Sequence, residues 1–218
     1  MHTGDLAHTK TQLSSEYFEM SSNFLKSLAD IAPTIMILGN HDGNLKNGDR
    51  QDAVTPVIDA LDHPNFTLLK NSGEYSPEPG LTFNVLSVFD RDNWQRPSNK
   101  NSINIALYHG SIMGSELNSE YAMDHGEDDI TIFESFDYAM LGDIHRTQYL
   151  DPDKKVWYAG STVQQNFGES RYKGYLMWNI MDKEKHVVEK RLFESPRPFV
   201  TISLNKDGTL PKVCAKKL

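Results

Sequence analysis

Residues 34–42 of this chain read TIMILGNHD, and this stretch decides the fold class. Thr34–Leu38 is a short, largely apolar run of the length expected for a buried strand. Gly39-Asn40-His41-Asp42 follows directly, so the predicted strand runs straight into a polar turn. In layered α/β folds, functional groups collect just beyond the carboxyl ends of the strands. The pattern therefore predicts an α/β domain with a functional site at the end of this strand.

Two later segments repeat this arrangement of an apolar run followed by polar residues. Ile103–Tyr108 leads into His109-Gly110, and Tyr138–Leu141 leads into Gly142-Asp143-Ile144-His145. Gly4-Asp5 would be a fourth such turn if a strand preceded it. Because neighbouring strands would bring these turns to one edge of a sheet, we expect their Asp, Asn and His side chains to converge on one point.

Periodicity and turn residues outline the rest of the chain. Residues 14–31 predict a helix that Ser14 or Ser15 caps. Thr55-Pro56 predicts a second helix, with Thr55 as its cap and Pro56 in its first turn, that ends near Leu61. Strands are expected at residues 66–69, 81–89, 103–108, 138–141, 156–159, 175–180 and 187–193, with polar loops at 71–80 and 92–101. Pro196-Arg197-Pro198 is the expected domain boundary, with a new strand from Phe199.

Composition limits the classes of protein that this chain can belong to. Its 218 residues are 38% hydrophobic, which suits a packed domain, and no apolar run approaches the ~18–20 residues of a membrane span. Cys214 is the only cysteine, so a disulfide framework and a thiolate metal site are excluded, and we expect a cytoplasmic protein. The net charge of -8 counts against a protein that coats DNA by charge alone. It does not exclude a nuclease, because carboxylates that hold divalent cations become a site that attracts phosphate.

The types of side chain in the polar turns indicate a metal site. Asp, Asn and His without cysteine suit Mn, Mg, Fe or Zn rather than a soft, sulfur-bound metal. A carboxylate has two oxygens and can bridge two cations. Two metal ions ~4 Å apart can stabilise both the attacking and the leaving oxygens of a displacement at phosphorus.

The same turns carry a resemblance to a known family. In order and separation they resemble the second to fifth motifs of the calcineurin-like metallophosphoesterases, over roughly residues 2–195. The resemblance implies a four-layer α/β/β/α sandwich. Within that superfamily the chain is most similar to the nuclease subunit of the SbcCD-type double-strand-break repair complex, particularly its phage and viral relatives. Ala159-Gly160-Ser161, the loop Gln164–Glu169 and Gly174-Tyr175 add to this similarity.

The resemblance also implies a role for each site residue. Asp5 would bridge two divalent metal ions, with manganese the first expectation and magnesium, iron or zinc as alternatives. Asn40, His109 and Asp143 would complete one metal site, and His145 would belong to the other. His41 would be the catalytic residue, which protonates the leaving oxygen or stabilises charge on the phosphoryl group without holding metal.

This sequence departs from the family pattern in two ways. The first family motif, Asp-x-His, is absent, so the site that contains His145 lacks two expected ligands. Asp143 stands where most relatives have His, and Asp binds the same cations more ionically and favours harder metals. We interpret the absence as a missing segment. Residues 1–195 would be a nuclease domain without its first strand, and residues 196–218 would begin a C-terminal capping domain, so that the fold is truncated at both ends.

His8 and Arg146 are two further candidates, for substrate binding. His8 follows Gly4-Asp5 at a spacing that could reach the metal edge or a substrate phosphate, or it could be a supporting or surface residue. Arg146 could contact a nucleic-acid backbone, although isolated arginines are more often solvated. The loop Gln164–Glu169 either lines the substrate groove or is a structural turn.

Together these features predict an enzyme that hydrolyses phosphodiesters with two bound metal ions. By resemblance, the substrate would be DNA, cut by exonuclease or endonuclease action in repair or recombination. The partner would be an SbcC-type ATPase with coiled-coil arms, and the subunit would form a homodimer. Two alternatives stay open: a calcineurin-like phosphatase or phosphodiesterase of other specificity, and a non-catalytic protein that keeps the fold but not both metals. The missing motif also leaves open that this segment is inactive by itself.

Overall fold

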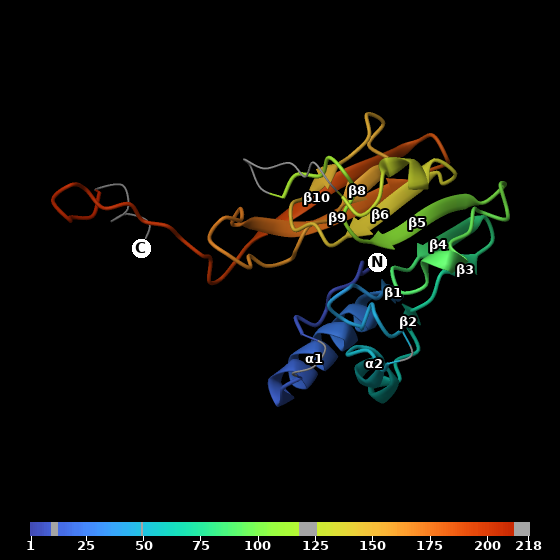
Figure 1. The fold of residues 1–218 in the computed structure, drawn as a ribbon, viewed down its shortest axis with the longest axis horizontal. Coiled ribbons are helices and arrows are strands. Elements are labelled where there is room, and N and C mark those ends of the chain that lie inside the picture. The colour runs from blue at the N-terminus through green and yellow to red at the C-terminus, as the bar shows by residue number, and fades with distance from the viewer. Residues whose placement is uncertain (10–12, 49, 118–125, 212–218) are drawn as a thin grey trace.

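The computed structural model describes residues 1–9, 13–48, 50–117 and 126–211. It shows a mixed α/β protein with a six-stranded mixed sheet, two smaller two-stranded sheets that pack on the same face of it, and helices (Figure 1). The predicted α/β class is thereby confirmed. Among the described residues, no helix is both long enough and apolar enough to cross a membrane.

The helices and strands of the described residues have the following bounds. The helices are α1 (Ser15–Ile31), α2 (Thr55–Leu61) and the short 3₁₀ helices η1 (Arg91–Asn93) and η2 (Ile130–Phe133). The strands are β1 (Thr34–Ile37), β2 (Phe66–Leu69), β3 (Gly73–Glu78), β4 (Leu81–Leu86), β5 (Ile103–His109), β6 (Tyr138–Gly142), β7 (Gln148–Tyr149), β8 (Val156–Tyr158), β9 (Tyr172–Ile180) and β10 (His186–Glu194).

Three hydrophobic clusters hold the layers together. Met36 of β1 packs with Leu25 of α1 and Val57 of α2, so both helices cover one face of the β1–β2 pair. The alternate side chains of β1, Ile35 and Ile37, pack against β4 and β5 of the large sheet, and the same cluster includes residues of β9. The other face of the large sheet packs against η2 and neighbouring loops. In Figure 1 α1 and α2 accordingly lie below β1 and β2, with the large sheet above them.

Parallel strands put several chain turns at one edge of the large sheet. The strand order is β3-β4-β5-β6-β8-β7, and β4, β5, β6 and β8 run parallel. In the pairing of β5 with β6, His109 lies opposite Gly142. The polar residues that follow these two strands are therefore neighbours in space, as the sequence predicts.

Both predicted helices form, but the cap of the second differs from the prediction. The Ser14 hydroxyl accepts a hydrogen bond from the Tyr17 N–H and caps α1. Thr55 is the first residue of α2 rather than its cap. The Asp52 carboxylate instead accepts hydrogen bonds from the Val54 N–H at 3.0 Å and the Thr55 N–H at 2.6 Å. The buried carboxylate of Asp52, three residues before Thr55, thus has the role that the sequence predicts for Thr55.

Two predicted stretches of secondary structure are wrong. The sequence predicts a loop at residues 71–80, yet β3 forms there and pairs antiparallel with β4. It is an edge strand, and Pro77 lies where its pairing with β4 shifts register between Tyr75 and Glu78, two settings in which proline is tolerated. No strand begins at Phe199 within residues 199–211. The Phe199 N–H instead binds Gln164 Oε1 at 3.0 Å, and its ring contacts Phe167. The expected truncation at residues 212–218 lies outside the described residues, and the domain division stays a prediction.

Candidate metal centre

Asp5 reaches the centre because the first residues of the chain pair with β1. The His2 N–H donates to the Ile35 carbonyl at 2.8 Å, and the Ile37 N–H donates to the His2 carbonyl at 3.1 Å. Gly4-Asp5 therefore lies beside the end of β1. Asp5 has a φ of 58°, a left-handed conformation that is uncommon for residues other than Gly. Such strained positions persist where the surrounding structure holds them, and they cluster at functional sites.

Asp42, to which the sequence assigns no role of its own, holds the Asp5 turn in place. Its buried carboxylate accepts hydrogen bonds from the N–H groups of Asp5 at 2.8 Å, Ala7 at 2.9 Å and Gly39 at 2.9 Å. Burial raises the pKa of Asp42 to about 6, although these three donors act to lower it. The last residue of Gly39-Asn40-His41-Asp42 thus ties the Asp5 loop to the end of β1. In the sequence, only the position of Asp42 at the end of this motif indicates that it belongs to the site.

His109 joins the centre from the end of β5. Its Nδ1 lies 2.6 Å from the Thr3 carbonyl oxygen and must donate to it, so the proton of the neutral ring sits on Nδ1. Nε2 then lies 3.3 Å from Asp5 Oδ2 and 3.9 Å from Asp143 Oδ1. Burial lowers the pKa of His109, but the nearby carboxylate of Asp5 outweighs burial and raises it.

Asp143 completes the group from the end of β6. Its φ is 94°, a second positive value at this site. The Gly142 that precedes it leaves no room for a side chain, because a Cβ there would overlap the Thr3 carbonyl and the His109 ring. Burial raises the pKa of Asp143, the nearby His109 opposes this shift, and the carboxylate of Asp5 adds to it. Two carboxylates thus converge on one imidazole nitrogen.

The residues present fit a divalent metal ion. One ligand atom from each of Asp5, His109 and Asp143 lies within 4.8 Å of the others. Asn40 Oδ1 and His109 Nε2 are both buried, and neither has a hydrogen-bond partner in the described structure. Buried polar atoms without partners are costly, and a cation would satisfy them. Oxygen and imidazole donors suit Mn, Mg, Fe or Zn.

His41 lies beside this group, as the sequence predicts. Its N–H donates to Asp5 Oδ1 at 3.0 Å, and its charge influences the pKa of both Asp5 and Asp143. The His41 Nδ1 lies 2.9 Å from the His8 carbonyl oxygen, and the two imidazole rings stack with centroids 5.8 Å apart. The structure thus places His8 as a support for His41. Its predicted contact with substrate stays a prediction.

His145 and Arg146 follow Asp143 along the wall of a cavity. This open cavity of about 410 Å³ is lined by Ser111, Leu117, Asp143, Ile144, His145, Asn166, Gly168 and Glu169. His145 Nδ1 lies 2.8 Å from Glu169 Oε1, a partner that the sequence did not reveal. Arg146 forms an ion pair with Glu116. The loop Gln164–Glu169 therefore lines the cavity beside Asp143, one of the two readings that the sequence left open.

Comparison with known proteins agrees with the resemblance at the level of the family. The model of the calcineurin-like phosphoesterase family matches residues 1–177. The chain is 39% identical over 201 residues to "Uncharacterized protein R555" of Acanthamoeba polyphaga mimivirus, and the matched region covers 87% of this chain and 15% of that protein. It is 27% identical over 194 residues to "Putative phosphoesterase 244L" of Invertebrate iridescent virus 6, and the matched region covers 83% of this chain and 64% of that protein. The chain thus spans less than two thirds of either relative.

Proposed function

Because this chain belongs to the calcineurin-like phosphoesterase family, we propose that it hydrolyses phosphodiesters with divalent ions held by Asp5, Asn40, His109 and Asp143. The family implies metal-dependent hydrolysis of phosphoesters. The observation that carries the proposal is the convergence of Asp5, His109 and Asp143 around a buried nitrogen with no hydrogen-bond partner in the described structure. In this proposal His145 contributes to a second ion from the wall of the adjoining cavity.

Each residue of the centre has a defined task. Bound divalent ions would lower the pKa of a water molecule and polarise the phosphate. Asp5 and Asp143 supply negative charge, and the Thr3 carbonyl keeps the lone pair of His109 on Nε2, which faces both carboxylates. Asp42 keeps the Asp5 turn rigid by binding three backbone N–H groups.

His41 is the proposed general acid. Its Nδ1–H donates to the His8 carbonyl, which fixes the orientation of the ring and leaves Nε2–H to meet the leaving oxygen. The hydrogen bond from its backbone to Asp5 keeps it next to the reacting phosphate without using its ring as a ligand. Transfer of a proton from Nε2 to the leaving oxygen then completes cleavage of the P–O bond.

We propose DNA as the substrate, with manganese as the bound ion. Support comes from the resemblance of residues 159–175 to the SbcCD-type nuclease subunit. Support comes also from the position of Asn166 and Gly168, which line the cavity next to Asp143. An SbcC-type ATPase partner and a homodimer belong to the same proposal and rest on the resemblance alone.

A smaller phosphodiester is the second candidate substrate. Arg146, the arginine considered for a nucleic-acid backbone, already binds the carboxylate of Glu116, and Arg91 binds Asp128 and Glu127. The net charge of -8 points the same way, because nucleic-acid binding relies on basic surface.

Hydrolysis assays with Mn²⁺ on linear duplex DNA and on bis(p-nitrophenyl) phosphate separate these candidates. Cleavage of DNA that is lost in Asp5→Asn supports the nuclease, and cleavage of the small diester alone supports the second candidate. Asp30→Asn, which removes an exposed carboxylate paired with Lys26, is the matched control and should leave activity unchanged. A chain that binds Mn²⁺ but cleaves neither substrate contradicts both and supports a non-catalytic protein.

A further inference from the structure

We propose that Glu169 is a positioning residue, which holds the His145 ring with its proton on Nδ1 so that Nε2 is free to bind a metal ion. The inference rests on the proposed metal-dependent function and adds to it a residue outside the motifs. Glu169 lies on the loop between β8 and β9, 24 residues after His145.

The contact between the two side chains is direct. His145 Nδ1 lies 2.8 Å from Glu169 Oε1, and Glu169 is much the more buried partner, with side-chain exposures of 37% for His145 and 9% for Glu169. An ionised carboxylate can only accept hydrogen bonds, so Nδ1 must be the donor. In a neutral imidazole the lone pair then lies on Nε2.

Other donors keep Glu169 ionised and fixed. Oε2 accepts from the Lys173 ammonium at 2.7 Å and from the Gln165 N–H at 3.1 Å, and Oε1 accepts also from Asn166 Nδ2 at 3.0 Å. All of these partners donate to Glu169, which is the arrangement that an ionised carboxylate requires.

Lys173 contacts the backbone of His145 directly and its ring through Glu169. Its buried ammonium donates to the His145 carbonyl at 3.1 Å and to Ser161 Oγ at 2.7 Å, in addition to Glu169. One cation thus fixes the backbone of His145 and the carboxylate that holds its ring. The arrangement constrains the position of the ring and the direction in which Nε2 faces.

The three histidines of the centre share this feature. His109 Nδ1 is bound by the Thr3 carbonyl, His41 Nδ1 by the His8 carbonyl, and His145 Nδ1 by Glu169. Metal-binding histidines usually donate their other N–H to a carboxylate or a carbonyl, which fixes the tautomer. Since Asp143, His145 and Glu169 line one cavity, the carboxylate orients a histidine beside the centre in addition to its contacts within its own loop.

Histidine tautomers in the metal-free chain, measured by long-range ¹H–¹⁵N correlation spectra, test the proposal. We expect Nδ1–H at His145 in the wild type. In Glu169→Gln the single amide oxygen should turn to Lys173 and the Gln165 N–H, which presents the NH₂ group to His145 and switches the ring to Nε2–H. Glu184→Gln, which alters a glutamate paired with Lys155, is the matched control and should change nothing at His145. His109 is an internal reference, because Thr3 sets its tautomer.

Added Zn²⁺ provides the second measurement. In the wild type, Zn²⁺ should shift the Nε2 signal of His145, and in Glu169→Gln binding at this nitrogen should weaken by ~10–100-fold. An Nε2–H tautomer at His145 in the wild type overturns the role of Glu169, even if the variant does not fold. An unchanged tautomer and zinc response in Glu169→Gln overturns it as well. A wild type with the expected tautomer in which no histidine responds to Zn²⁺ contradicts instead the metal-dependent function.

Discussion

Backbone carbonyls and N–H groups orient most of the reactive side chains at this centre. The Thr3 carbonyl sets His109, the His8 carbonyl sets His41, and Asp42 binds the N–H groups of Asp5 and Gly39. Backbone groups within a folded loop move less than free side chains do. The centre is therefore arranged for its ligands before they bind.

His41→Ala should abolish hydrolysis while the metal content stays close to that of the wild type. Loss of a general acid typically costs ~10²–10⁴ in rate, because the developing charge on the leaving oxygen is no longer neutralised. The measurement is kcat on the substrate found with Mn²⁺, paired with metal analysis. His63→Ala is the control, since His63 binds Asp30 on the outer side of α1. A His41→Ala protein that cleaves at the parental rate, or that is purified without metal, refutes this division of labour.

Asp143→His should keep metal binding and activity but shift selectivity from Mn²⁺ toward Zn²⁺. An imidazole is a softer donor than a carboxylate, and its charge is one unit less negative. The φ of 94° is compatible with the change, because His adopts positive φ more readily than most residues. Competition between the two ions, followed by metal analysis, measures the shift, with Asp153→His on the exposed surface as control. Unchanged selectivity would remove Asp143 from the set of ligands.

At the scale of elements, the centre depends on how closely the ends of β1, β5 and β6 approach. A Cβ on Gly39 would overlap the Asp5 carboxylate and the His109 ring, and one on Gly142 would overlap the Thr3 carbonyl. Glycine is therefore required at the end of β1 and of β6, where a functional turn meets the next. Strand pairing brings the turns to one edge, and these glycines let them touch.

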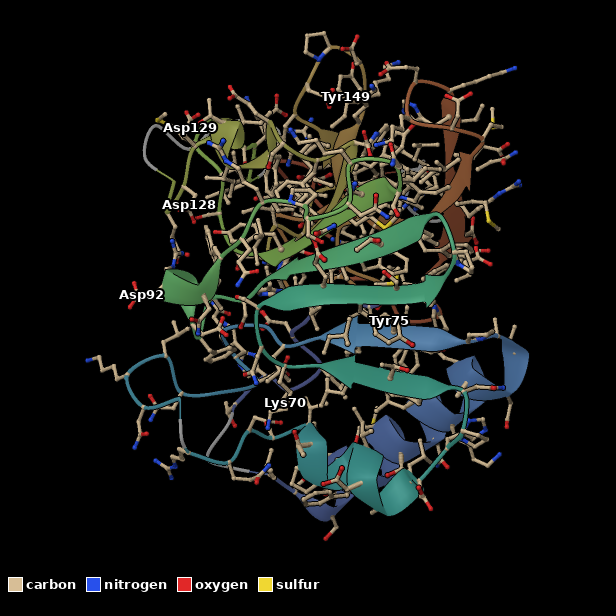
Figure 2. All side chains as sticks on the ribbon, turned by 90° about the vertical axis from the view of Figure 1, so that its right-hand side faces the viewer. Lys70, Tyr75, Asp92, Asp128, Asp129 and Tyr149 are labelled. Carbon is tan, nitrogen blue, oxygen red and sulfur yellow. The ribbon has the colours of Figure 1, made fainter. Side chains whose placement is uncertain are left out.

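The short helix α2 depends on Asp52, which stands just before it. Its carboxylate binds the Val54 and Thr55 N–H groups, the Thr55 hydroxyl, and Lys70 at the end of β2, labelled in Figure 2. Asp52→Ala should lower the free energy of unfolding by about 1–2 kcal/mol, as loss of a helix cap does. Asp59→Ala, which removes an exposed carboxylate from α2, should change it little. Equal stabilities of the two variants by urea unfolding would disprove the capping role.

The contribution of Asp52 should also depend on pH. Burial raises the pKa of Asp52, but Lys70 and the helix N–H groups outweigh it and hold the pKa below its ordinary value of 3.8. The stabilisation is then fully present above about pH 4 and is lost as the pH falls through the lower pKa of the folded state. The difference in stability between the wild type and Asp52→Ala should shrink below pH 4.

At the scale of the whole molecule, the layers bring distant segments to one centre. Tyr75 of β3, labelled in Figure 2, packs in the hydrophobic cluster between the large sheet and β1, and this cluster holds the two sheets together. Asp5 from the start of the chain, His109 from the end of β5 and Asp143 from the end of β6 lie close together there. The group is thus a property of the complete packing.

The chain should bind one divalent ion much more tightly than a second. Within the described residues, Asp5, His109 and Asp143 form the group whose three ligand atoms converge, while His145 faces the adjoining cavity. Calorimetric titration with Mn²⁺ measures this difference, with Asp5→Asn as the variant that should lose the tight step. Two ions bound with equal affinity would contradict it.

The sequence alone determined the strand-and-turn pattern and indicated candidate residues for the centre. Thr34–Leu38 followed by Gly39-Asn40-His41-Asp42 is a local signal, since a buried strand and a glycine-led polar turn are encoded by adjacent residues. The α/β class followed from it and is confirmed, as is the family. The convergence of Asp5, His109 and Asp143 also followed, because parallel strands share one edge.

Only the tertiary structure decided which atoms each of these residues meets. β3 was missed because an edge strand with Pro77 carries weak local signals and is defined by its pairing with β4. The contacts of Asp42 with Asp5 and of Glu169 with His145 join residues 37 and 24 positions apart. No local pattern encodes such a contact. It exists because packed layers bring two loops together, and that packing sets the tautomers, the pKa values and the geometry of the centre.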